Sequence, residues 1–151
     1  MSVRKKRILL VDDEANPDPS EFVVGNYLTY YETRLTDAGF DVQVAQSDQE
    51  AMRHMTESDG DFDLVILDLH FPTRRGTGSA IPNPVQPEDY AGVIFARWVK
   101  QQKIMVPIVV LTNVTDVKVT DSLRNIEAVK CILFKHICTP RELVDLVKCL
   151  V

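Results

Sequence analysis

Short apolar runs and polar stretches alternate along the chain. Five of the runs are rich in valine, isoleucine and leucine, and most of these are followed by a segment with helical periodicity. Continuous rather than alternating hydrophobicity is typical of strands that are covered on both faces. The pattern predicts a doubly wound α/β fold, with helices on both faces of a five-stranded parallel sheet. The predicted strands are residues 7–11, 41–45, 64–67, 108–111 and 129–134.

Local signals mark the ends of several helices. Capping boxes begin at Ser47 and at Thr139, and the second has proline at its first helical position. Gly39 is a typical C-terminal cap for a long aromatic helix predicted over residues 21–38. A helix predicted over residues 116–126 is rich in valine and threonine, which are weak helix formers, so we expect it to be short.

Composition limits the classes of protein to consider. Apolar residues make up 45% of the 151 residues and charged residues 26%, as in ordinary globular domains. We expect a single domain over residues 1–151 that is cytoplasmic, because no apolar run is long enough for a membrane span or a signal peptide. The net charge of −5 argues against direct nucleic-acid binding. The cysteines, Cys131, Cys138 and Cys149, lack metal-site spacing and are expected to pack as reduced thiols.

Polar residues of chemical interest follow the predicted strands. Asp12 and Asp13 follow the first strand, Asp68 the third, Thr112 the fourth and Lys135 the fifth. In a doubly wound sheet, ligands bind outside the carboxyl ends of the strands. We therefore expect these five side chains to face one crevice.

Three carboxylates in one crevice repel one another unless a cation lies among them. Oxygen ligands favour Mg²⁺ or Mn²⁺, which also binds phosphoryl groups. A carboxylate such as Asp68 can act as a nucleophile and form an aspartyl phosphate. The Thr112 hydroxyl can hydrogen-bond a phosphoryl oxygen, and Lys135 can pair with that oxygen or, without phosphate, with Asp68.

Four sequence blocks resemble the signature blocks of the response-regulator receiver domain of two-component signalling. They are ILLVDDE, LVILDLHFP, PIVVLTN and CILFK, and the resemblance extends over residues 7–151. It implies a flavodoxin-like fold with strand order 2-1-3-4-5. It also implies a phosphorylation-dependent switch rather than an enzyme, limited to self-catalysed phosphotransfer and autodephosphorylation.

The resemblance implies a role for each strand-end residue. Asp68 would accept a phosphoryl group from a histidine kinase or a phosphotransfer protein, and Thr112 and Lys135 would bind that group. The metal ligands would be Asp12, Asp13, Asp68 and the backbone carbonyl of His70. Output would come from partner binding, with a homodimer through the face from the fourth to the fifth helix as one form.

The chain departs from the family at several positions. His136 replaces the proline that follows the family's lysine, so we expect a trans peptide bond there. Ile132 replaces the family's switch aromatic, which changes the expected coupling. Asn113 and His70 stand at positions that affect access to the phosphoryl group, and predict an unusual phosphoryl lifetime.

Two proline-rich or glycine-rich segments, residues 15–20 and 73–89, follow the first and third predicted strands. We interpret them as insertions at the rim of the crevice, the second being an enlarged loop. One hypothesis is a flap in which Arg74 and Arg75 contact a partner or the phosphodonor. The alternative is an ordinary surface loop.

Two other functions compete with the phosphoacceptor. A degenerate receiver would keep the fold as a phosphorylation-independent interaction module, and Ile132 and His136 favour it. An aspartate-nucleophile phosphatase of the haloacid-dehalogenase class needs a second acid two residues after the nucleophile, where this chain has His70.

Overall fold

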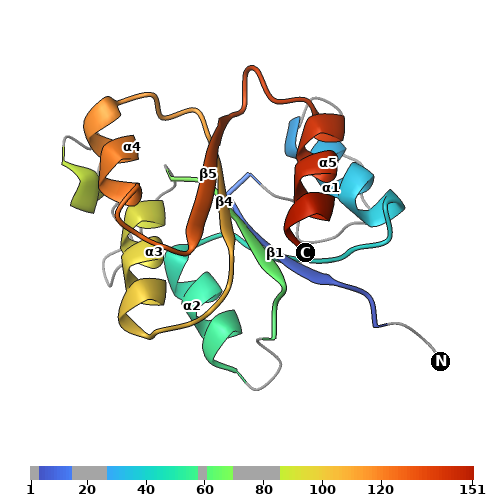
Figure 1. The fold of residues 1–151 in the computed structure, drawn as a ribbon, viewed down its shortest axis with the longest axis horizontal. Helices are drawn as coiled ribbons and strands as arrows, with labels where there is room; N and C mark the ends of the chain where they lie inside the picture. The colour runs from blue at the N-terminus through green and yellow to red at the C-terminus, as the bar shows by residue number, and fades with distance from the viewer. Residues whose placement is uncertain (1–3, 15–26, 58–60, 70–85) are drawn as a thin grey trace.

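The structure is a computed structural model that describes residues 4–14, 27–57, 61–69 and 86–151. Five parallel strands form one sheet in the order β2-β1-β3-β4-β5, as predicted (Figure 1). The fourth strand is one residue longer than predicted. The strands are β1 (Arg7–Val11), β2 (Asp41–Ala45), β3 (Leu64–Leu67), β4 (Ile108–Thr112) and β5 (Val129–Phe134).

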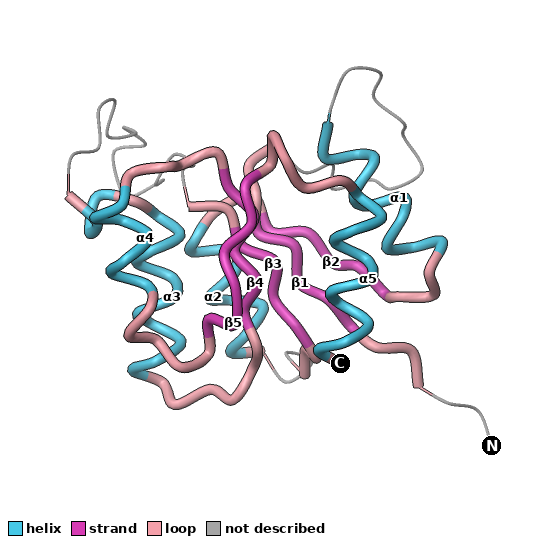
Figure 2. The backbone as a smooth tube through the Cα atoms, turned by 45° about the horizontal axis from the view of Figure 1, so that its top comes forward, coloured by secondary structure: helices cyan, strands magenta, loops and turns pink. Residues whose placement is uncertain are grey.

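Helices cover both faces of the sheet, and Figure 2 shows α1 and α5 on one face and α2, α3 and α4 on the other. The helices are α1 (Tyr27–Asp37), α2 (Asp48–Thr56), α3 (Ala91–Gln101), α4 (Val117–Leu123) and α5 (Pro140–Leu150), and a 3-10 turn, η1, spans Pro87–Asp89. None of the described helices is long and apolar enough to cross a membrane.

Two hydrophobic clusters, one on each face, hold these layers together. Neighbouring residues of a strand point to opposite faces, so Leu9 and Val11 pack toward α2 and α3 while Ile8 and Leu10 pack toward α1 and α5. All four residues of β3 are buried, which fits its central place in the sheet. The strand that carries Asp68 is therefore rigidly packed on both sides.

The side-chain N-caps of the two predicted capping boxes are present, although Glu50 Oε2 accepts from the N–H of Gln46. The backbone N–H of Glu50 donates to Ser47 Oγ at 3.0 Å, and that of Glu142 donates to Thr139 Oγ1 at 3.2 Å. Gly39 has a φ of 95° and ends α1, as predicted. The fourth helix is short, as expected, and ends at Leu123 rather than at residue 126.

Some predicted segments lie wholly or partly outside the residues that the structure describes. The structure describes α1 from Tyr27, so the predicted helix start near residue 20 and the insertion at 15–20 lie outside the described residues. The second insertion lies outside them too, up to residue 85. Its last part was predicted as loop but contains η1, because proline suits the first position of a helical turn.

All three cysteines are free thiols, as predicted. Cys138 is buried, and this burial raises the pKa of its thiol. Cys149 is exposed, so the expectation that every cysteine packs was wrong for this one. It lies near the end of α5, on the side of the helix that faces away from the core.

Candidate functional site

The ends of the central strands bring three carboxylates together. Val11 pairs with Leu67 across β1 and β3, so Asp12 and Asp68 follow at the same level of the sheet. One carboxylate oxygen from each of Asp12, Asp13 and Asp68 lies within 4.8 Å of the others. Asp12 and Asp68 are buried, whereas Asp13 is exposed. The crevice therefore has two covered carboxylates and one that faces solvent.

Lys135 places its ammonium between the two buried carboxylates. Its Nζ lies 2.7 Å from Asp12 Oδ2 and 3.2 Å from Asp68 Oδ2. We expected Lys135 to pair with Asp68 in the absence of phosphate, and the structure adds a shorter contact with Asp12. A single ammonium thus bridges the ends of β1 and β3 from the loop after β5.

Burial and repulsion govern the ionisation of this group. Burial, followed by the charge of Asp68, raises the pKa of Asp12 to about 7, although Lys135 acts in the opposite direction. Burial opposes the charge on Lys135, but the attraction of Asp68 and Asp12 outweighs it and raises the Lys135 pKa above its ordinary value. The lysine stays charged, while Asp12 is held as an anion only incompletely near neutral pH.

Backbone hydrogen bonds orient the two buried carboxylates. The N–H of Leu69 donates to Asp68 Oδ1 at 2.8 Å, which leaves Oδ2 toward Lys135. The N–H of Glu14 donates to Asp12 Oδ1 at 3.0 Å, and Asp12 Oδ2 receives the lysine. Each carboxylate therefore has one oxygen fixed by its own turn and the other facing the crevice.

Thr112 and Lys135 are linked to each other through the backbone. The N–H of Lys135 donates to the carbonyl of Thr112 at 2.9 Å. The Thr112 side chain is buried, and its Oγ1 accepts from the N–H of Val114 at 3.1 Å. The structure therefore brings the side chains of Asp12, Asp13, Asp68 and Lys135 together, and Thr112 is joined to this group through its backbone bond to Lys135.

The donor set suits a small divalent cation. Every side-chain donor in the cluster is a carboxylate oxygen, which Mg²⁺ and Mn²⁺ prefer. One lysine does not neutralise three carboxylates, so a site for additional positive charge remains. The exposed Asp13 lets a bound cation keep part of its water shell, as Mg²⁺ usually does. His70, whose carbonyl was expected as a further ligand, lies outside the described residues.

Gly92 supports Asp68 from behind, and the sequence analysis did not identify it. A Cβ at this position would lie 2.2 Å from the carbonyl oxygen of Asp68 and 2.6 Å from the Cα of Leu69. The N–H of Gly92 also donates to the carbonyl of Leu69 at 3.1 Å. A glycine in the first turn of a helix was the available signal, since glycine is otherwise unfavourable there. Any larger residue here would require α3 or the backbone of Asp68 to shift.

Tyr31 of α1 holds the loop that carries Lys135. The side chain is fully buried. Its hydroxyl donates to the carbonyl of Cys138 and lies 3.4 Å from the carbonyl of Lys135. The sequence did not reveal the role of this hydroxyl, because the acceptors lie more than 100 residues away.

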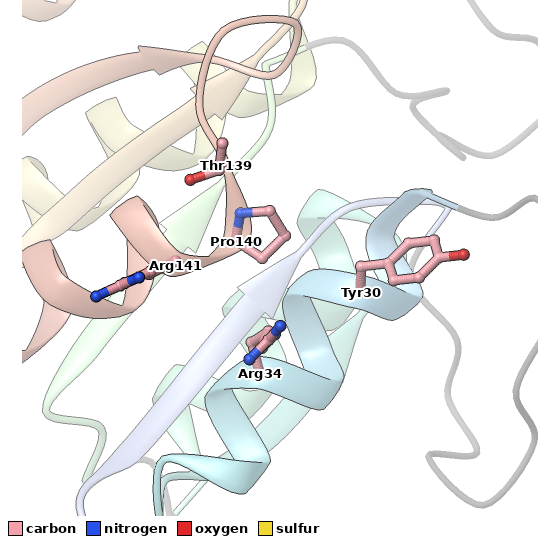
Figure 3. A pocket seen from close by; sticks show the side chains of 5 residues that line it. All are labelled: Tyr30, Arg34, Thr139, Pro140 and Arg141. Carbon is pink, nitrogen blue, oxygen red and sulfur yellow. The ribbon is translucent and has the colours of Figure 1, made fainter.

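Tyr31→Phe should lower the free energy of unfolding by about 1–2 kcal/mol, because it leaves a buried carbonyl without its donor while the ring still fills its place. Urea denaturation measures this change. Tyr30, the preceding residue, is 48% exposed, and Figure 3 shows its hydroxyl pointing away from Thr139 and Pro140. An unchanged free energy of unfolding in Tyr31→Phe would contradict a role for the Tyr31 hydroxyl.

The positions that depart from the receiver pattern are only partly described. No cis peptide bond occurs among the described residues, so the bond before His136 is trans, as predicted. Ile132 packs against the hydrophobic cluster on the α2, α3 and α4 face. Asn113 and His136 are exposed. Arg74 and Arg75, which the flap hypothesis requires, lie outside the described residues.

Comparison with solved structures identifies the fold. A response regulator receiver domain protein of Methanospirillum hungatei superposes with a TM-score of 0.70 at 18% identity, covering 96% of this chain and 92% of its own. For the signal receiver domain of an HD domain-containing protein of Pseudomonas fluorescens, the TM-score is 0.68 at 19% identity, with coverages of 97% and 94%. The chemotaxis protein CheY4 of Vibrio cholerae gives 0.65 at 21% identity, with coverages of 98% and 100%. No family model and no curated protein sequence matches the chain.

Proposed function

We propose that this chain, which has the fold of response-regulator receiver domains, is a phosphorylation-dependent switch of two-component signalling. Asp68 accepts a phosphoryl group from the phosphohistidine of a histidine kinase or a phosphotransfer protein. The observation that carries the proposal is the position of the Lys135 ammonium, 3.2 Å from Asp68 Oδ2 and beside a cluster of three carboxylates. Packing alone does not require this collection of buried charges.

In this proposal, Asp12, Asp13 and Asp68 hold Mg²⁺ or Mn²⁺, with the backbone carbonyl of His70 as a further ligand. The bound ion supplies positive charge that screens the repulsion between the carboxylates and an incoming phosphoryl group. Lys135 lies 3.2 Å from Asp68 Oδ2 and 2.7 Å from Asp12 Oδ2, so its ammonium is already within reach of a phosphoryl group carried by Asp68.

Asp68, Lys135 and Thr112 have different roles in the phosphoryl transfer. A carboxylate oxygen of Asp68 attacks phosphorus, the bond from phosphorus to the histidine nitrogen breaks, and the imidazole leaves with that electron pair. The Lys135 ammonium pairs with a phosphoryl oxygen and the Thr112 hydroxyl donates to another, which compensates the charge on the product. Hydrolysis by water restores the carboxylate, so the chain acts at most on its own phosphate and is not an enzyme with an external substrate.

The phosphoryl group would change the position of the loop between Lys135 and Cys138, because Lys135 moves from Asp12 toward phosphate. The output is partner binding, and a homodimer through the face from α4 to α5 is one form of it. We expect a cytoplasmic protein, as for other domains that meet histidine kinases there.

Labelling with a small phosphodonor tests the proposal. Incubation with acetyl phosphate and Mg²⁺ should add one phosphoryl group, which peptide mass spectrometry locates on Asp68, and a chelator should prevent the addition. Asp68→Asn should remain unlabelled while its circular dichroism stays unchanged. A folded wild-type protein that takes up no phosphate would instead favour the phosphorylation-independent interaction module.

A further inference from the structure

A groove lies at the end of the sheet opposite the carboxylates. The connections that precede β4 and β5 enclose a cavity of about 680 Å³. Because both strands are parallel to β3, their amino ends lie at the edge away from Asp68. Apolar side chains form much of the lining, namely Ile104, Met105, Val106, Ile126, Ala128 and Leu150. This volume is in the range of pockets that accept a few side chains or a small ligand.

The groove carries an exposed hydrophobic residue and a concentration of positive charge. Met105 is 91% exposed, and methionine adapts its shape to different partners. Lys100, Lys103 and Lys130 line the groove and are exposed, and none forms an ion pair with the part of the chain that the structure describes. Glu127 alone is acidic among the described lining residues. A basic groove is notable in a chain of net charge −5.

Lys103 has a backbone conformation that favours glycine. Its φ is 56°, and it ends α3 in the same way as Gly39 ends α1. The N–H of Lys103 donates to the carbonyl of Lys100 at 3.1 Å, and the next N–H, that of Ile104, donates to Val99 at 3.2 Å. This is the pattern of a helix-ending motif in which glycine is the usual residue. A lysine therefore stands at the rim of the groove against its conformational preference, a feature that often accompanies function.

We propose that this basic groove docks a segment of a partner protein that carries apolar side chains flanked by aspartate or glutamate. The apolar floor and Met105 would contact the apolar side chains, and the three lysines would attract and orient the acidic ones. The charge of the lining argues for an acidic segment, and its concave shape argues for a peptide. The groove lies at the opposite edge of the sheet from Asp68, and none of its lining residues belongs to the carboxylate crevice.

Titration with a designed peptide tests the proposal. The probe is an acidic amphipathic helix of about 15 residues with leucines on one face and glutamates elsewhere, and its partner probe replaces every glutamate by lysine. The methyl resonance of Met105 should shift and saturate with the acidic probe only. Added salt should weaken the binding, because the attraction involves exposed charges.

Lys103→Gly separates a binding role from a structural one. Glycine suits the positive φ, so the variant should melt at a higher temperature and yet bind the acidic probe about three- to tenfold more weakly. Lys130→Gln should weaken binding similarly. Lys148→Gln is the control, because Lys148 is exposed on α5 and does not line the groove. It should leave the affinity unchanged.

Four results would overturn the proposal. The first is a Met105 signal that neither probe shifts, and the second is equal binding of the acidic and basic probes. The third is a Met105 shift on anionic lipid vesicles without one on the peptide. The last is a shift that depends on protein concentration alone, which would indicate contact between two copies of the chain.

Discussion

Gly92→Ala is expected to lower the free energy of unfolding by about 2–3 kcal/mol and to slow phosphate uptake at Asp68. The new methyl carbon would lie 2.2 Å from the Asp68 carbonyl oxygen and 2.6 Å from the Leu69 Cα, and both of these atoms belong to the backbone. Either the start of α3 must move away or the end of β3 must shift. The second movement displaces the carboxylate that has to face Lys135 and the metal ligands.

Urea denaturation and the rate of labelling by acetyl phosphate measure the two effects. Gly39→Ala is the control, because Gly39 also has a special conformation but a Cβ there meets no atom within 4 Å. Its φ of 95° makes alanine unfavourable by about 1 kcal/mol. Gly39→Ala should therefore lose stability and keep the labelling rate. Normal labelling in Gly92→Ala would show that α3 gives way and that the glycine does not position Asp68.

Asp12→Asn is expected to stabilise the metal-free protein at pH 8 and to flatten its pH profile. The pKa of Asp12 is raised from 3.8 to about 7 in the folded chain, first by burial and then by Asp68. Between these values the folded state binds a proton that the unfolded state does not. Stability from this group is therefore present below about pH 4 and is lost as the pH rises through 7. The loss is at most about 4 kcal/mol, and we expect about 1–3 kcal/mol.

Lys135 does not cancel this loss of stability with rising pH. Its pKa is raised above 10.5, so its contribution to stability persists through the whole window from pH 4 to 8. Denaturation at pH 5 and at pH 8 with a chelator present measures the effect, and Asp13→Asn is the control because Asp13 is exposed. Saturating Mg²⁺ should restore the stability of the wild-type protein at pH 8 and do less for Asp12→Asn. A wild-type profile that is flat from pH 5 to 8 would contradict the raised pKa.

The strand pattern could be predicted because each strand packs against neighbours on both faces. Such burial selects valine, isoleucine and leucine in uninterrupted runs, and these are visible without any knowledge of the partners. Helix ends were predictable because their caps are local. The Ser47 and Thr139 caps bond to amides only three residues away, so the sequence contains both the donor and the acceptor.

The residues that form the candidate site could be predicted, but the contacts between them could not. The carboxyl ends of parallel strands lie at one edge of the sheet. The alternation of strands and helices therefore predicts that Asp12, Asp68 and Lys135 meet at that edge. The shorter contact of Lys135 with Asp12 rather than Asp68 depends on how the loop after β5 leaves the sheet. Tyr31, from a helix far away in the sequence, influences the course of this loop. No local sequence pattern predicts that contact.

The sequence by itself therefore determined the strands, the helix ends marked by Ser47, Thr139 and Gly39, and the residues that meet at the carboxyl edge, because periodicity and capping are local. Only the tertiary structure decided that Gly92 lies against Asp68, that the Tyr31 hydroxyl holds the Lys135 loop, and that Lys103 and Lys130 share a groove. These are contacts between segments far apart in the chain. Their geometry depends on how whole helices dock on the sheet. Burial of apolar surface drives this docking, but it is non-directional and does not by itself set the orientation of a helix.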